Sequence, residues 1–234
     1  MSRRILSWKV LVTTLTAALS VQGELLAQNR PVVIAMLPFE DRGSYGQDKE
    51  IFRALRLGIP ATIAGELSGH PELRLADPQR VARALKGQKR DPGGRVDAAT
   101  AARVGKEAGA RYAISGNFSD FYGKVSLDAR IVDVETGQIV KVVTNDDPNL
   151  QDRANLYRIV QMVGHKVLAA ASGGGAGAAE RENRIIPTDA LTDYSLGLLY
   201  ESQGEKARAA QHYNQALSIF PAYTEARDGA NRVR

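Results

Sequence analysis

Cysteine is absent from the 234 residues of this chain. Its absence excludes disulfide bonds, a thiol nucleophile, thiolate metal ligands and a lipid attached to an N-terminal cysteine. Histidine is scarce as well. His70, His165 and His212 are the three in the sequence, and they lie too far apart to have the spacing of a metal site. We therefore expect neither a metal ion nor another cofactor.

A strong charge of one sign is also lacking once the N-terminal segment is set aside. The whole chain has a net charge of +5, but residues 1–23 contain three basic residues and no acidic one. The remainder has 28 basic and 26 acidic residues, a net charge of +2. A balance of this kind leaves no basic footprint for nucleic acid, so no nucleic-acid partner is predicted.

The N-terminal sequence is typical of an export signal. Three basic residues precede a run of apolar and small residues at 10–21. That run is too short to span about 30 Å of hydrocarbon, and it has the length of the apolar part of a signal peptide. We predict a signal peptide over 1–23, cleaved near Gly23 or near Ala27, and a periplasmic protein. Retention of the segment as an uncleaved anchor is the alternative.

Residues 30–171 are predicted to form one α/β domain. A continuous run of apolar and β-branched residues at 32–39 predicts a buried strand. Apolar residues spaced by three and four predict a helix over 51–67, with a kink or a late start caused by Gly58 and Pro60. Two further helices are predicted from their N-terminal caps, Asp77 followed by Pro78, and Asp97.

Three β-rich runs follow, at 112–121, 124–135 and 138–145. They are separated by short turns that each contain a glycine, which is typical of antiparallel hairpins. An amphipathic helix over 152–171 closes the domain. The predicted fold class is therefore α/β, with packed helices on a mixed sheet that includes a three-stranded antiparallel meander.

The last part of the chain is predicted to be a separate helical unit. Residues 172–187 are rich in glycine and alanine, as flexible linkers are. Within residues 188–234, the small and aromatic residues of 190–223 resemble a single tetratricopeptide repeat, which implies two antiparallel helices, and a short capping helix follows. The residues expected to pack the two helices are Gly197, Tyr200, Ala209, Tyr213, Ala216 and Pro221.

A single repeat of this type cannot bury its own apolar surface. In the tetratricopeptide family, partner peptides lie along the inner face of the first helix. Matched residue by residue, the resemblance implies partner-binding residues at Leu191, Tyr194, Leu198 and Glu201. The alternative, that these side chains pack within the protein, is equally open.

Four segments of the α/β domain resemble the CsgG/TolB-amino-terminal-like family of bacterial envelope domains. They lie at 32–42, 73–81, 101–118 and 126–140, in the order and spacing of that family. The resemblance implies a compact α/β domain whose relatives are periplasmic or outer-membrane-associated and act mostly by binding other proteins. The chain lacks the lipid-anchoring cysteine of the family's channel proteins, so a channel-forming role is not predicted.

No set of residues has the pattern of a catalytic site. Four carboxylates in or beside the meander are candidate acid–base groups, but we predict that they are exposed, ion-paired strand residues. They are Asp120, Asp128, Asp133 and Glu135. The chain is predicted not to be an enzyme.

The predicted function is that of a non-enzymatic periplasmic protein-interaction module in bacterial cell-envelope assembly or transport, similar to an accessory of curli-type secretion. The expected partner is a protein of the cell envelope. Association with the outer membrane through that partner and homo-oligomer formation are both open. The alternative is a small-ligand-binding or enzymatic periplasmic domain whose site is assembled from residues far apart in the sequence.

Overall fold

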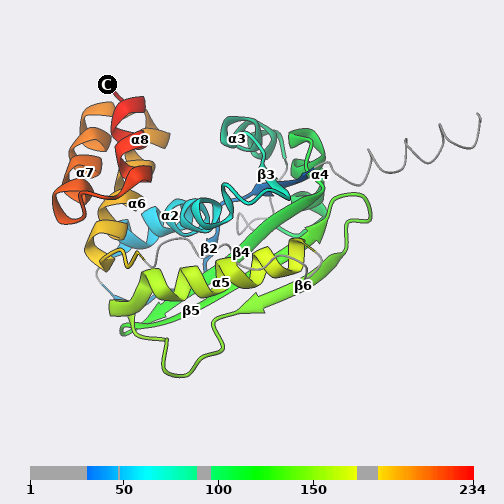
Figure 1. Cartoon of the computed structure of the whole chain (residues 1–234), viewed down its shortest axis with the longest axis horizontal. Coiled ribbons are helices and arrows are strands. Elements are labelled where there is room, and N and C mark those ends of the chain that lie inside the picture. Colours follow the sequence, from blue (N-terminus) through cyan, green and yellow to red (C-terminus); the bar gives the residue numbers. More distant parts are fainter. Residues whose placement is uncertain (1–30, 47, 89–95, 173–183) are drawn as a thin grey trace, which may run out of the picture. The chain divides into compact units, whose positions relative to one another are not determined.

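The strands of this protein form one mixed sheet (Figure 1). The computed structural model describes residues 31–46, 48–88, 96–172 and 184–234. The expected signal peptide and most of the expected linker therefore lie outside the described residues. The strands are β1 Val32–Met36, β2 Glu40–Asp41, β3 Leu73–Leu75, β4 Tyr112–Phe121, β5 Lys124–Asp133 and β6 Ile139–Thr144.

The sheet combines a parallel half with an antiparallel half. Its strand order is β3-β1-β4-β5-β6, and the short strand β2 also pairs with β4. Strands β3, β1, β2 and β4 pair in parallel, whereas β4, β5 and β6 form an antiparallel meander. At the β4–β5 turn, Tyr122 and Gly123 have φ angles of 52° and 85°. Two positive φ angles in a two-residue turn match the right-handed twist of the flanking strands. The predicted meander is confirmed.

Helices cover both faces of the sheet, which confirms the predicted α/β fold class. Their bounds are α2 Lys49–Leu67, α3 Pro78–Gly87, α4 Ala98–Ala108 and α5 Leu156–Ala171, and the 3₁₀ turn η1 Arg153–Asn155 precedes α5. The apolar residues of α2 and α5 share one core with Ile34, Ile114 and Phe118, while those of α3 and α4 share a second core with Ala35 and Ala113. Adjacent residues of one strand thus face opposite layers, as the alternation of a strand requires.

Helix α2 runs without a break through Pro60, so the expected late start is wrong. Proline has no N–H and cannot donate to the carbonyl of the residue four positions earlier, which here is Arg56. That carbonyl instead accepts the backbone N–H of Phe39 at 2.8 Å. The Nε of Arg56 in turn donates to the Phe39 carbonyl at 3.3 Å. The proline therefore frees an acceptor that fixes the segment after β1 to the middle of α2.

The C-terminal residues form a helical hairpin and a third short helix, as predicted. These are α6 Thr188–Gln203, α7 Lys206–Ile219 and α8 Thr224–Arg232. The ring of Tyr213, in α7, fills the space between two glycines. A Cβ atom on Gly197 would lie 2.5 Å from its Cδ1 atom, and one on Gly229 would lie 2.6 Å from its Cζ atom. Tyr213 itself is fully buried.

Of the other residues expected to pack the two helices of the hairpin, all but one are buried. Tyr200, Ala209 and Ala216 are buried, whereas Pro221 is exposed just after α7. Proline at that position cannot extend α7. Gly204 ends α6 with a φ angle of 80°, and its N–H bonds the carbonyls of Glu201 and Tyr200.

Helix α6 packs directly on α2 (Figure 1). At the crossing, a Cβ atom on Gly58 would lie 2.5 Å from the Cβ atom of Ser195, which is fully buried. The hydroxyl of Ser195 donates to the Leu191 carbonyl of its own helix at 2.7 Å. The side chains of the hairpin and those between α2, α5 and the sheet belong to one continuous core. Residues Val32–Arg234 form one compact unit.

We expect Gly58→Ala to destabilise the protein by about 1–3 kcal/mol, because the added methyl group overpacks the crossing of α2 and α6. The free energy of unfolding, measured by urea denaturation followed by circular dichroism, tests this. Gly164→Ala in α5 is the matched control. Its new Cβ atom would lie 3.5 Å from the nearest neighbouring atom, an ordinary contact. That variant should keep or gain stability, by up to about 1 kcal/mol, from its higher helix propensity. Equal stabilities of the two variants would contradict close packing at Gly58.

Candidate functional site

Three aromatic side chains lie exposed and in contact with one another beside the β4–β5 turn. We call Tyr45, Phe121 and Tyr122 the aromatic cluster. Their relative exposures are 56%, 60% and 71%. Ring centroids are 5.9 Å apart for Tyr45 and Phe121, 4.9 Å for Tyr45 and Tyr122, and 5.0 Å for Phe121 and Tyr122. Tilted and edge-on arrangements at these distances are favourable for aromatic pairs. A contiguous exposed aromatic group of this kind is a candidate contact surface.

Asp120 fixes the two chain segments that supply the aromatic cluster. Its backbone carbonyl accepts the N–H of Tyr45 at 2.8 Å, and its own N–H donates to the Ser44 hydroxyl at 2.9 Å. Its carboxylate accepts the N–H of Gly123 at 2.8 Å. The Ser44 hydroxyl also donates to Asp41 at 2.6 Å. The loop after β2 and the β4–β5 turn are therefore both held by the same residue.

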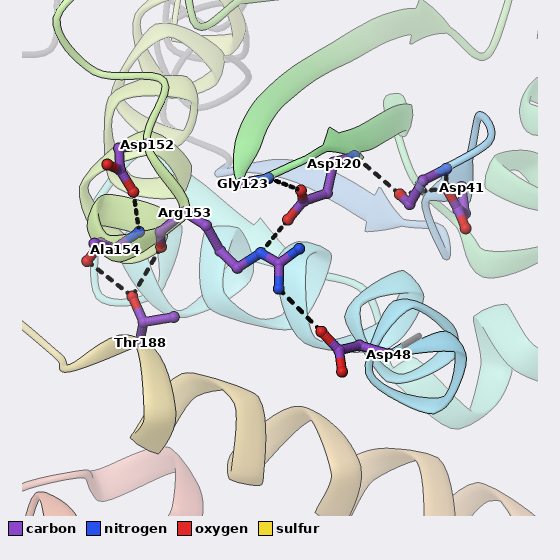
Figure 2. Close-up of polar contacts among 9 residues, drawn as sticks. Asp41, Asp48, Asp120, Gly123, Asp152, Arg153, Ala154 and Thr188 are labelled. Atoms are coloured by element: carbon purple, nitrogen blue, oxygen red, sulfur yellow. Dashed lines mark hydrogen bonds and ion pairs between the residues drawn. The ribbon is translucent and has the colours of Figure 1, made fainter. Parts of the chain in front are cut away.

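The Asp120 carboxylate is almost completely buried, with 2% of the side chain exposed, and it forms an ion pair with Arg153 (Figure 2). The Arg153 guanidinium also bonds Asp48, just before α2, at 3.1 Å. In the same view, the hydroxyl of Thr188 donates to the carbonyls of Arg153 and Ala154 at 3.1 and 2.9 Å. One arginine thus connects the sheet, the start of α2, the start of α5 and the start of α6.

The charges around this arginine are balanced by direct contacts. The hydrogen bond with Asp120 is the main cause that raises the pKa of Arg153 above its ordinary value. The guanidinium also lies over the ring of the buried Phe52, 5.6 Å from the centroid. Within the aromatic cluster, a hydrogen bond with Tyr45 raises the pKa of Tyr122. The site is an uncharged aromatic surface on a framework of paired charges.

The four residues expected to bind a partner peptide lie in different surroundings. Leu191 and Tyr194 are buried, with 0% and 5% exposed, and the Tyr194 ring packs against Tyr223 with centroids 5.0 Å apart. Leu198 is half-buried, and Glu201 is half-buried and bound to Arg232 of α8 at 2.9 Å. The burial of Leu191 and Tyr194 agrees with the alternative that these side chains pack within the protein. Binding of a partner by the inner face of α6 stays a prediction.

Two of the four carboxylates considered as acid–base groups are buried, so their expected exposure is wrong. Asp120 is 2% exposed and Asp133 is 6% exposed. Backbone N–H donors, first that of Thr136, together with Arg111 hold the pKa of Asp133 below its usual range. The expected ion pairing is present for all four. Arg111 bonds Asp133 and Glu135 at 2.8 and 2.7 Å, and Asp128 lies 3.8 Å from Arg130.

Two kinds of site, for a metal ion and for a membrane, have no candidate in the part of the chain that the structure describes. No group of three or more histidine, aspartate or glutamate side chains there could hold a metal ion. Within the same residues, none of the helices combines the length and the apolar character needed to cross a membrane.

Sequence reasoning missed the aromatic cluster because its members come from separate segments. Phe121 ends a predicted strand and Tyr122 lies in a predicted turn, where large aromatic side chains have no buried neighbours to meet. Large aromatic residues at a strand end and in a turn were the signal from which an exposed aromatic surface could have been predicted. Nothing local indicated that Tyr45, in the loop before α2, would pair with Phe121.

Comparison with known proteins finds distant structural likenesses and no family. No known family model matches the sequence, and no curated protein matches it. The LpoB C-terminal domain from Escherichia coli is similar at 16% identity, with a TM-score of 0.37 over 50% of this chain and 82% of that chain. The hypothetical protein CT253 from Chlamydia trachomatis is similar at 12% identity, with a TM-score of 0.35 over 61% and 99%.

A third similar structure is the PelC dodecamer from Paraburkholderia phytofirmans. It is 17% identical, with a TM-score of 0.33 over 61% of this chain and 89% of that chain. Likenesses this distant carry no conclusion about function. Membership of the CsgG/TolB-amino-terminal-like and tetratricopeptide families stays a prediction.

We expect Arg153→Gln to destabilise the protein by at least about 2 kcal/mol, because it leaves the Asp120 carboxylate buried without its cation. Amide hydrogen exchange should also become faster at Tyr45 and Gly123, whose N–H groups bond Asp120. Arg158→Gln is the matched control, since Arg158 is exposed on α5, and it should change stability by no more than about 0.5 kcal/mol. Unchanged exchange at both amides in Arg153→Gln would show that the ion pair does not hold the cluster.

Proposed function

We propose that this protein is a non-enzymatic protein-interaction module of the bacterial cell envelope, and that the aromatic cluster is its principal contact surface. The main support for this proposal is the exposure of Tyr45, Phe121 and Tyr122 on a framework fixed by a buried ion pair. Aromatic residues are enriched among the side chains that contribute most to protein–protein affinity. Their pre-organisation here lowers the entropy lost on binding.

The envelope location rests on the predicted export signal, which supports a periplasmic chain. Within that location, the partner we expect is another protein with an apolar concavity that receives the β4–β5 turn. An accessory role in curli-type secretion, contact with the outer membrane through the partner and homo-oligomer formation are finer expectations that we keep as predictions. The partner-binding role of Leu198 and Glu201 is a further such prediction.

Site-specific photo-crosslinking in living cells identifies the partner directly. A photoreactive amino acid at position 122 should crosslink to one envelope protein, whereas the same group at position 140 should not. Val140 is a suitable control because it is 52% exposed on β6, outside the aromatic cluster. Crosslinks of the same intensity to the same proteins from both positions would contradict the proposal.

Binding of the purified partner then tests the contribution of the aromatic cluster. We expect the triple variant Tyr45→Ser, Phe121→Ser, Tyr122→Asn to lose at least about tenfold in affinity, which corresponds to about 1.4 kcal/mol. Asparagine is chosen at 122 because it tolerates a positive φ angle. The control variant Ile139→Ser, Val140→Ser, Val142→Ser removes three exposed apolar side chains from β6 and should bind normally. Equal affinities of the two variants, measured by isothermal titration calorimetry, would refute the role of the cluster.

A further inference from the structure

A pocket of about 240 Å³ lies between α2, the segment after β1, α3 and α6. It is separate from the aromatic cluster. Its walls are mostly apolar, formed by Pro38, Leu57, Leu85, Val96 and Leu199. Leu85, Val96 and Leu199 are each buried, and Leu85 and Val96 belong to the core that α3 and α4 share with the sheet.

Two arginines on successive turns of α2 line the same pocket. The guanidinium of Arg53 has no hydrogen bond or ion pair with any of the residues that the structure describes, and its side chain is exposed. Arg56 is half-buried and uses its Nε to bond the Phe39 carbonyl at 3.3 Å, which orients its guanidinium. The one acidic lining residue, Glu40, already accepts the backbone N–H of Val96. Among the described residues, the lining of the pocket therefore carries two cationic side chains and one carboxylate beside an apolar wall, a net charge of +1.

The size of the pocket restricts what it can hold. Sites that enclose a whole small molecule usually measure about 300–1,000 Å³, so a volume of about 240 Å³ suits a single residue. An internal apolar residue of a polypeptide carries no charge to meet the arginines. An aspartate or glutamate carries the charge but has little apolar surface. A C-terminal apolar residue has both, because its carboxylate and its side chain leave the same Cα atom.

We propose that this pocket binds the apolar C-terminal residue of a partner polypeptide, with Arg53 and Arg56 holding the terminal carboxylate. Arginine is suited to this role because its planar guanidinium bonds a carboxylate through two parallel N–H donors. The apolar side chain, of the size of leucine, rests on Leu57, Leu85 and Leu199. The backbone of the preceding residues of the partner contacts the mouth of the pocket before it reaches solvent. This inference concerns a site other than the aromatic cluster and is tested independently of it.

The test uses the purified chain and an N-acetylated pentapeptide, Gly-Ser-Gly-Ser-Leu, with a free C-terminal carboxylate. A one-residue anchor predicts a Kd of about 1 mM, which NMR titration measures. The same peptide with a C-terminal amide should bind at least about tenfold more weakly, because it cannot form the charge-assisted bonds. Equal binding of both peptides, or no binding up to about 10 mM, would overturn the proposal.

Two arginine variants test whether the peptide binds in this pocket. Arg53→Gln should lower the affinity for the free-acid peptide at least about tenfold, and Arg158→Gln, which removes an exposed arginine of α5, should leave it unchanged. Since Arg53 is exposed and has no partner among the described residues, its replacement should not affect folding. An unchanged affinity in Arg53→Gln would overturn the proposal.

Two further measurements separate the alternatives. The triple variant of the aromatic cluster should bind the peptide normally, so failure here is distinguishable from failure of the proposed function. N-acetylleucine, a free acid of the same chemistry, should bind more weakly than the pentapeptide, which adds backbone contacts at the pocket mouth. Equal affinities of the two would assign the pocket to a small carboxylic acid and contradict a polypeptide occupant.

Discussion

The ion pair between Asp120 and Arg153 is the interaction on which the arrangement of this protein most depends. A carboxylate with 2% of its side chain exposed is strongly unfavourable unless a cation and hydrogen-bond donors compensate for the lost hydration. Arg153 supplies the cation, and the N–H of Gly123 supplies a donor. Because Arg153 also bonds Asp48, and Thr188 bonds the Arg153 carbonyl, the residue that compensates Asp120 also joins the starts of α2, α5 and α6.

Helix α2 helps to position both proposed contact surfaces, the aromatic cluster and the pocket. Its N-terminal side is tied to Arg153 by Asp48, and its middle holds the segment after β1 through the Arg56 carbonyl that Pro60 leaves free. The first contact positions the loop that carries Tyr45, and the second shapes the pocket beside Arg53 and Arg56. Surfaces held by a packed helix lose little conformational entropy when a partner binds, which favours specific contacts over adaptable ones.

The elements could be predicted from the sequence wherever the signal is local. Asp97 caps α4 by accepting the N–H of Thr100, as the sequence predicted, and Gly109 ends that helix with a φ angle of 74°. The meander followed from three β-rich runs and from the glycine-containing turns between them. The burial of Asp120 could not be predicted in this way, because it depends on Arg153, a residue of another element. The same holds for the aromatic cluster, whose Tyr45 and Phe121 meet only through the pairing of loop and strand.

The C-terminal hairpin shows how nonlocal packing changes the meaning of a sequence pattern. A lone repeat of two helices must cover its apolar surface, and the sequence left open whether a partner or the protein itself does so. Here α8 covers Tyr194 through Tyr223, and α2 meets α6 at the close approach of Gly58 and Ser195. Both interactions use residues without a distinctive local pattern. Since Leu191 and Tyr194 are covered within the chain, our proposed contact with a partner rests on the exposed aromatic cluster instead.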